Sequence, residues 1–154
     1  ALNVNVYDDD LTDNIELNDV GYLIAITGSD TVNEHALSNF SEVFGEHGSY
    51  KIASSVEAKD ATTKERTSFL TPNDDFINLS EAFRENPMIN EVKITSEKEY
   101  YETLDTLTFQ EKAIPLFIEK GKGLYLIPEF EKTTEEKKEL TVFYLGKKLM
   151  HQEK

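Results

Sequence analysis

The strongest constraint on the fold is an uninterrupted apolar segment at residues 20–27, which reads VGYLIAIT. Apolar residues without alternation are typical of a strand that is covered on both faces, as the strands of parallel sheets are. The segment ends in a Gly-Ser-Asp turn, and a helical pattern over residues 31–44 precedes a second strand-like segment at 50–56. The order strand, helix, strand predicts a crossover connection and a parallel sheet.

Local signals predict the limits of the helix between these two strands. Thr31 and Glu34 have the spacing of a capping box, and Asp30 is an alternative cap. Two glycines, Gly45 and Gly48, predict its end. The inward face combines apolar residues at helical spacing, namely Val32, His35 or Ala36, Phe40, Val43 and Phe44.

The rest of the chain divides into a short opening and a longer second part. Alternating Leu, Val and Asn residues predict a strand at 1–7, and Leu11 opens a short amphipathic turn. Residues 57–68 are polar, and they form either a short helix or a connector. The second part alternates helical and strand-like segments: helices at 75–85 and 96–107, strands at 89–94, 113–118, 124–127 and 140–145, a hairpin signal at 119–123 and a charged loop at 130–139.

These patterns predict an α/β fold, in which a partial Rossmann-like parallel sheet is followed by a small α+β module. We place the two parts at residues 1–66 and 67–154. A length of 154 residues is sufficient for one domain or for two small ones that share a core.

The charge balance excludes several classes of partner. Sixteen Lys and Arg residues against 30 Asp and Glu give a net charge of −14, so the chain repels nucleic acid and anionic lipid surfaces. Because the chain contains no cysteine, disulfides and thiolate metal sites are excluded. No apolar run approaches the ~20 residues of a membrane span, so we expect no direct membrane insertion of this segment.

Residues 1–56 contain a recognisable series of motifs. A strand ends in Tyr7-Asp8-Asp9, and a short helix leads to DVGYLIAITGSDTVNEHALSNFSEVFG and a further strand. This series resembles the second half of the Rossmann-type regulatory domains attached to potassium channels, potassium-uptake systems and cation:proton antiporters. The segment EHALSNFSEVFG is especially similar to cytoplasmic regions of bacterial sodium/proton antiporters, and AIPLFIEKGKGLYLIP is similar to their terminal module.

The resemblance implies a nucleotide-binding edge. Four residues match the family's polar positions at two strand ends and the following helix: Asp9, Thr27, Asp30 and Asn33, whereas Asp8 replaces a glycine of the family. Ligands of parallel sheets bind beyond the carboxyl ends of the strands, where Asp9 and Thr27 are expected. An ordinary structural role remains open, because Asp30 and Asn33 also suit the first turn of a helix and Thr27 suits the end of a strand.

One departure from the family limits what this segment can bind. The phosphate-binding turn G-x-G-x-x-G and the acidic residue that holds the ribose are both absent. We therefore expect a C-terminal fragment of a longer membrane-embedded protein, with no cofactor held by this fragment itself. In the full-length protein the resemblance implies NAD or an adenine nucleotide.

Other candidate sites have weak support in the sequence. The acidic residues Asp8, Asp9, Asp10 and Asp13 fail as a calcium loop because Asp13 occupies the position of the required glycine. The three histidines show no ligand spacing, and no Ser lies in a G-x-S-x-G elbow. The sequence therefore predicts neither a metal site nor an enzyme.

The predicted function follows from the resemblance. It implies a regulatory domain, on the cytoplasmic side of the cell membrane, of a monovalent cation/proton antiporter that senses a nucleotide or mediates dimerisation. Its partners would be the transmembrane antiporter domain of the same polypeptide and a second copy in a homodimer. The alternative is a protein–protein interaction module without nucleotide binding, because an open sheet edge recruits other chains.

Overall fold

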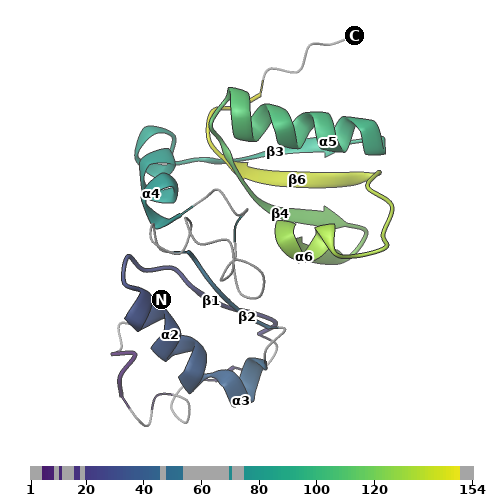
Figure 1. The fold of residues 1–154 in the computed structure, drawn as a ribbon. Helices are drawn as coiled ribbons and strands as arrows, with labels where there is room; N and C mark the ends of the chain where they lie inside the picture. Colours follow the sequence, from purple (N-terminus) through teal and green to yellow (C-terminus); the bar gives the residue numbers. More distant parts are fainter. Residues whose placement is uncertain are drawn as a thin grey trace. The chain divides into compact units, whose positions relative to one another are not determined.

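The chain forms two compact units, which we call unit 1 (Ala1–Phe69) and unit 2 (Leu70–Lys154) (Figure 1). The structure is a computed structural model. It describes residues 5–8, 11, 16–17, 20–45, 48–53, 70 and 75–149. Together the units give a mixed α/β protein with one small parallel sheet and one antiparallel sheet.

Unit 1 contains the predicted parallel strand pair. Strand β1 (Leu23–Ala25) pairs in parallel with β2 (Ser49–Lys51), and Ile24 lies opposite Tyr50. Helix α2 (Asp30–Asn39) connects them and contacts both strands. The parallel pairing is therefore confirmed, although both strands are shorter than the sequence predicts.

The start of α2 differs from both predicted caps. Ser29 has the extended backbone of a cap residue, and its hydroxyl accepts a hydrogen bond from the Val32 amide at 3.4 Å. The predictions of Asp30 and Thr31 were wrong because both residues already lie inside the helix. The carboxylate of Asp30 instead bonds to Lys51, so it is directed toward β2.

The predicted single helix is divided near its end. A second short helix, α3 (Ser41–Phe44), follows Phe40 and ends at Gly45, whose positive φ of 63° suits glycine. Ala36 and Phe40 are buried as predicted, but Val43 is 50% exposed. The division at Phe40 interrupts the helical period, and this explains why the inward face does not continue to Val43.

The predicted opening strand is wrong for its described part. Residues 5–8 form a turn, in which the Asp8 amide donates to the Asn5 carbonyl at 3.1 Å. The Asn5 side-chain oxygen also accepts from the Tyr7 amide at 3.2 Å, and such local bonds compete with strand pairing. Leu11 is helical and buried, whereas residues 1–4, 12–15 and 57–68 lie outside the described residues.

Unit 2 is built on a four-stranded antiparallel sheet. Its strands are β3 (Ile89–Ile94), β4 (Ile114–Lys120), β5 (Gly123–Leu126) and β6 (Leu140–Leu145). Their spatial order is β3-β6-β4-β5. Strands β3 and β6 have the predicted limits, and the predicted hairpin joins β4 to β5 through Gly121, whose φ is 62°.

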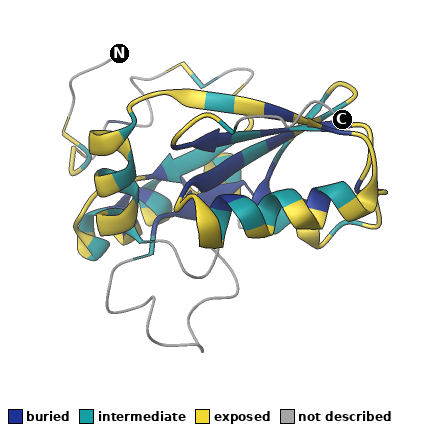
Figure 2. Ribbon diagram, turned by 90° about the horizontal axis from the view of Figure 1, so that it is seen from above, coloured by how far each residue is buried: buried dark blue, intermediate teal, exposed yellow. Residues whose placement is uncertain are grey.

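Helices α5 (Glu97–Asp105) and α6 (Ile127–Glu131) pack on this sheet, and α5 continues into the π-helix η2 (Thr106–Gln110). Unit 2 also contains helix α4 (Phe76–Glu85), which buries none of its residues. Helix α5 contacts β3, while α6 contacts β4 and β5. The core between these layers contains Val92, Ile94, Tyr100, Leu107, Ala113, Ile118, Ile127, Phe130, Leu140, Val142 and Tyr144. Figure 2 shows the buried segments along the strands and the exposed outer side of the helices.

Side-chain caps explain where the first helices of unit 2 begin. Asp75 accepts from the Asn78 amide at 2.9 Å, and Ser96 accepts from the Glu99 amide at 3.3 Å, as its capping-box spacing predicts. The prediction of a loop from residue 130 was wrong in its first residues, because α6 extends to Glu131 and buries Phe130 completely. No helix in the described part of the chain is long and apolar enough to span a membrane.

Candidate functional site

The candidate site lies at the carboxyl edge of the parallel strand pair in unit 1. Thr27 follows β1 after one residue, and Lys51 is the last residue of β2. Because the strands are parallel, both ends meet at one edge of the sheet. The N-terminus of α2 begins at this edge, after the Ser29 cap.

Asn33 joins α2 to the end of β1. It is buried, with 1% of its surface exposed, and its side-chain oxygen accepts from the Thr27 amide at 3.1 Å and from the Thr27 hydroxyl at 2.7 Å. Its side-chain amide donates to the Thr27 carbonyl at 3.0 Å. The Asn33 side chain is thus directed toward the backbone of Thr27, which fixes the strand end against the helix.

Lys51 joins α2 to the end of β2. Its ammonium group lies 2.7 Å from an Asp30 carboxylate oxygen, and it also bonds to the Glu34 carboxylate. The Lys51 side chain is 7% exposed, whereas those of Asp30 and Glu34 are 42% and 59% exposed. The two carboxylates, one helical turn apart, therefore provide a buried ammonium group with counter-charges that remain in contact with water.

The structure brings three of the four predicted site residues together. Thr27 lies in the turn between β1 and α2, and Asp30 and Asn33 lie in the first turn of α2. Asp9 lies outside the described residues. Sequence reasoning missed Lys51. A signal was available, because a lysine inside a strand pattern requires a carboxylate, and Asp30 and Glu34 have i, i+4 spacing on the preceding helix.

The chemistry of this edge favours ligands with hydrogen-bond donors. Thr27 and Ser29 are exposed, and Asp30 presents a partly exposed carboxylate beside them. A carboxylate accepts hydrogen bonds from hydroxyl and amino groups but repels a phosphate group. The only cation found at this edge among the described residues, Lys51, is bonded to two carboxylates.

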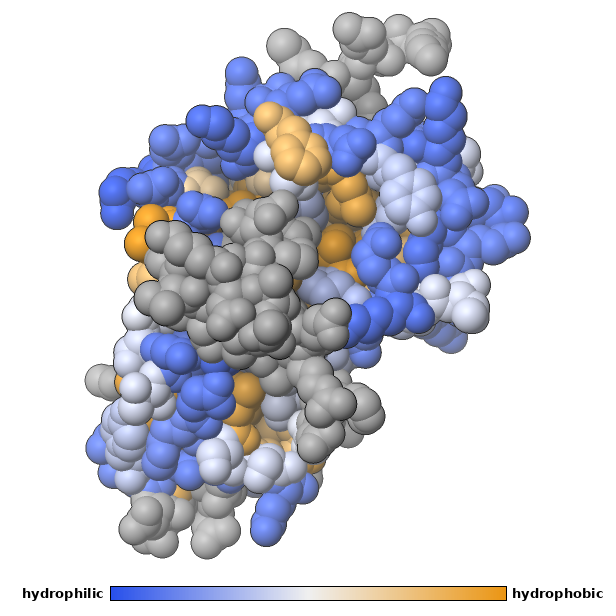
Figure 3. All heavy atoms as spheres, viewed as in Figure 1, coloured by the Kyte–Doolittle hydropathy of each residue, from blue (hydrophilic) through white to orange (hydrophobic). Residues whose placement is uncertain are grey.

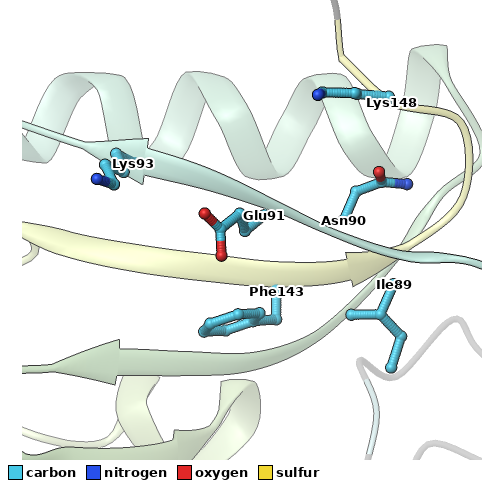
Figure 4. A pocket seen from close by; sticks show the side chains of 6 residues that line it. All are labelled: Ile89, Asn90, Glu91, Lys93, Phe143 and Lys148. Carbon is cyan, nitrogen blue, oxygen red and sulfur yellow. The ribbon is translucent and has the colours of Figure 1, made fainter.

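Unit 2 has an open hollow of about 540 Å³ on its sheet. It is lined by residues of β3 and β6 and of the segment after β6: Ile89, Asn90, Glu91, Lys93, Phe143 and Lys148 (Figure 4). Glu91 lies opposite Phe143 in the strand register, and both charge signs are present. The hollow therefore suits a surface that is itself amphipathic better than a single charged group.

Two buried polar groups in unit 2 have internal partners. The Tyr100 hydroxyl donates to the Glu131 carboxylate, and the pKa of Tyr100 is raised, first by burial and then by this bond and the negative charge of Glu131. Lys137 donates to the Phe130 carbonyl at 2.8 Å and lies 4.3 Å from the centre of the Phe130 ring. Both groups connect α6 to its surroundings, and this is a structural role.

His35 and Lys120 bond or pack within the fold and give no further site. His35 packs against Tyr7 with ring centres 4.5 Å apart, and its Nε2 lies 3.1 Å from the Asn39 side-chain nitrogen. Lys120 is paired with Glu135 at 3.2 Å. In the ranges that the structure describes, no group of three His, Asp or Glu residues could hold a metal ion.

Comparison with protein-family models, with curated proteins and with solved structures finds no match for this chain. Among the described residues, hydrophilic side chains predominate on the face drawn in Figure 3, in agreement with the net charge of −14.

Proposed function

We propose that this chain is a cytoplasmic regulatory domain of a monovalent cation/proton antiporter. The observation that supports it most is the grouping of Thr27, Asp30 and Asn33 at the carboxyl edge of a parallel strand pair. The same residues carry the resemblance to such domains. Their grouping is what a Rossmann-like nucleotide edge requires, although hydrogen bonds inside a strand–helix junction require it as well.

The ligand that this edge would take is the nucleoside part of NAD or of an adenine nucleotide. Hydroxyl groups of a ribose and the amino group of an adenine can donate to the Asp30 carboxylate, whereas the charge of the chain disfavours the phosphates. Without phosphate contacts, we expect a dissociation constant on the order of 1 mM for this chain alone. The proposed ligand controls transport only if it binds one conformation of the domain better than another.

The bridge through Lys51 supplies a route for such control. Asp30 and Glu34 hold α2 to β2, and Asp30 is also the carboxylate that a nucleoside would contact. A ligand that draws Asp30 away from Lys51 would remove one of the two carboxylates to which the ammonium group is bonded. Binding and the position of α2 relative to β2 are therefore coupled in the proposed mechanism.

A protein–protein interaction module without nucleotide binding is the second candidate. It is favoured by large apolar side chains that unit 2 leaves exposed, at 52% for Ile77, 60% for Phe83, 66% for Met88 and 71% for Phe109. Exposed apolar residues of this size, when they gather on one side of a domain, are typical of contact surfaces.

Nucleotide titration of the 154-residue chain tests the first proposal. We expect no thermal shift of several degrees with ATP, ADP or NAD at ~100 μM, and a saturable shift near 10 mM that Asp30→Asn removes. The matched control is Asp105→Asn at an exposed position of unit 2, which should leave the shift unchanged. Absence of any saturable shift, or a shift unaffected by Asp30→Asn, would contradict nucleotide binding at this edge.

The gene upstream of Ala1 tests the antiporter assignment. We expect it to encode a glycine-rich turn, preceded by about ten or more apolar stretches of roughly 20 residues each. Sodium- or potassium-driven proton exchange by the complete polypeptide in membrane vesicles should then respond to nucleotide, and Asp30→Asn should weaken that response. An upstream region without apolar stretches would contradict the assignment.

A further inference from the structure

Strand β3 forms one margin of the sheet in unit 2. It pairs with β6 on one side, and no described strand pairs with it on the other. Every second amide and carbonyl of an edge strand points away from its neighbour, so β3 presents backbone groups that another strand can pair with.

Charges of opposite sign alternate on the outer face of β3. Glu91 and Lys93 are exposed and lie two residues apart, so their side chains are on the same face (Figure 4). Val92 and Ile94 lie on the opposite face and are buried, with 4% and 1% exposed. A lone lysine on an edge strand normally discourages pairing, but here a carboxylate lies on the same face within reach of the same partner strand.

Symmetry restricts how this edge can pair with a copy of itself. In a two-fold antiparallel pair, each residue lies opposite its symmetry mate about one central residue. Centring the pair on Glu91 or on Lys93 would bring two like charges together. Centring it on Val92 brings Glu91 of each copy opposite Lys93 of the other, so two reciprocal ion pairs form.

From this complementarity we propose that the chain forms a symmetric homodimer through β3, with Val92 on the two-fold axis. The two sheets then continue into one sheet of eight strands, four from each copy. The proposal gives residues and a strand register to the homodimer that the resemblance to regulatory domains implies, and in this it rests on the proposed function. It does not depend on nucleotide binding, since β3 lies in unit 2 and Asp30 lies in unit 1.

The dimer should be weak. Pairing of a single edge strand buries less surface than a standard interface, and we expect a dissociation constant on the order of 10 μM. The net charge of −14 on each copy opposes association at long range. At 0.15 M salt the screening length of about 8 Å suppresses that repulsion while charges in contact still interact.

Charge reversal at the axis provides the test. Sedimentation velocity of the chain from ~1 to 300 μM should show a monomer–dimer equilibrium. With Glu91→Lys, a lysine at position 91 of each copy faces Lys93 of the other, so two lysine–lysine pairs form. With Lys93→Glu, two glutamate–glutamate pairs form in the same way. Each single variant should weaken the dimer at least about tenfold, and the double variant E91K/K93E should restore it, because the reciprocal pairs re-form with exchanged signs.

Mixing the two single variants sharpens the test. A Glu91→Lys chain and a Lys93→Glu chain place lysine opposite glutamate at both positions, so the mixture should form heterodimers that native mass spectrometry resolves by mass. The matched control is Lys122→Glu, an exposed lysine in the β4–β5 turn, which should leave the dissociation constant unchanged. Circular dichroism of each variant confirms that the chain remains folded.

A chain that stays monomeric at 300 μM overturns the proposal. So does a dimer whose dissociation constant Glu91→Lys leaves unchanged, or one that Lys122→Glu weakens as much as Glu91→Lys does. Failure of the double variant to restore the dimer overturns the Val92 register. These outcomes do not decide whether the chain binds nucleotide. If the chain is monomeric but shows a saturable thermal shift with nucleotide that Asp30→Asn removes, the first proposal still holds. If the chain dimerises but shows no such thermal shift, the β3 dimer holds and nucleotide binding at the Asp30 edge does not.

Discussion

Lys51, Tyr100 and Lys137 are polar residues whose side chains lie almost entirely inside the fold. Lys51 bonds to two carboxylates, Tyr100 donates to Glu131, and Lys137 donates to backbone carbonyls. A buried polar group is tolerated when its hydrogen-bonding capacity is met. At these positions, changing the residue therefore affects the partner left behind as well as the residue that is removed.

Tyr100 should make the protein sensitive to alkali. Its pKa is raised above the usual value of 10.0, so the unfolded chain releases the phenolic proton at a lower pH than the folded chain does. The stability contributed by the neutral phenol is complete below pH 10 and is lost as the pH rises above it. The expected slope is about 1.4 kcal/mol per pH unit from this group, and urea unfolding between pH 9 and 11.5 measures it.

Tyr100→Phe isolates this contribution from the other groups that titrate in alkali. The variant should be less stable at neutral pH, because Glu131 loses its donor, but its stability should fall less steeply above pH 10. Tyr101→Phe is the control: Tyr101 is 46% exposed, so its removal should change the slope less. Equal slopes for Tyr100→Phe and the parent chain would refute the explanation.

At the scale of elements, the ends of strands depend on individual glycines. Gly146 follows β6 with a φ of 144°, and a Cβ atom placed there would lie 2.6 Å from the Cβ atom of Ala113. Ala113 itself is buried just before β4. The junction between β6 and β4 therefore requires both the conformational freedom of glycine and the space that a side chain would fill.

Gly146→Ala should destabilise unit 2 by about 2 kcal/mol, because backbone strain and a clash with Ala113 add together. Denaturant unfolding followed by circular dichroism measures the loss. Gly21→Ala is the matched control, since a Cβ atom at Gly21 would meet nothing within 4 Å and should change stability little. If both variants lost the same stability, the contact with Ala113 would not be the cause.

The elements that the sequence predicted best are those fixed by their own residues. Strands 89–94 and 140–145 have clear hydrophobic patterns, the helix after Asp75 has a side-chain cap, and the structure confirms all three. The strand predicted at 1–7 is wrong at residues 5–7, where the Asn5 side chain closes a turn. Helix α6 was missed because its one turn, with Pro128 near its start, is too short to show a period.

The candidate site was predictable to a similar degree. Thr27, Asp30 and Asn33 are close in sequence, so a strand end followed by a helix brings them together in almost any α/β arrangement. Lys51 is distant in sequence, and its pairing with Asp30 depends on which strand lies beside β1. That choice is made by tertiary packing, which residue types and local spacing do not specify.

At the scale of the whole molecule, each of the two units contains one of the described sheets. The parallel pair of unit 1 is held by short strands and by the side chains of Asn33 and Lys51. Unit 2 has a larger sheet and a contiguous core. Because each described sheet takes its strands from one unit alone, we expect the two units to lose structure separately.

Asn33→Ala tests that separation. Thr27 would lose the partner of its amide, its hydroxyl and its carbonyl, and unit 1 should lose about 1–3 kcal/mol. Hydrogen exchange followed by mass spectrometry should show faster exchange in β1 and α2 and unchanged exchange in β3 and β6. The exposed Ser38→Ala in the same helix is the control, and equal acceleration in both units would contradict separate unfolding.

The π-helix η2 gives the molecule a place where the length of the chain can vary. The Glu111 amide bonds to the Thr106 carbonyl, five residues back, so this turn contains one residue more than an α-helical turn. Loss of one residue here would tighten the turn and leave α5 as it is. The same loss inside α5 would rotate every later side chain by about 100° and carry Leu107 out of the core. Among descendants of this sequence, single-residue deletions should therefore survive at residues 108–110, after Leu107, more often than within Glu97–Asp105.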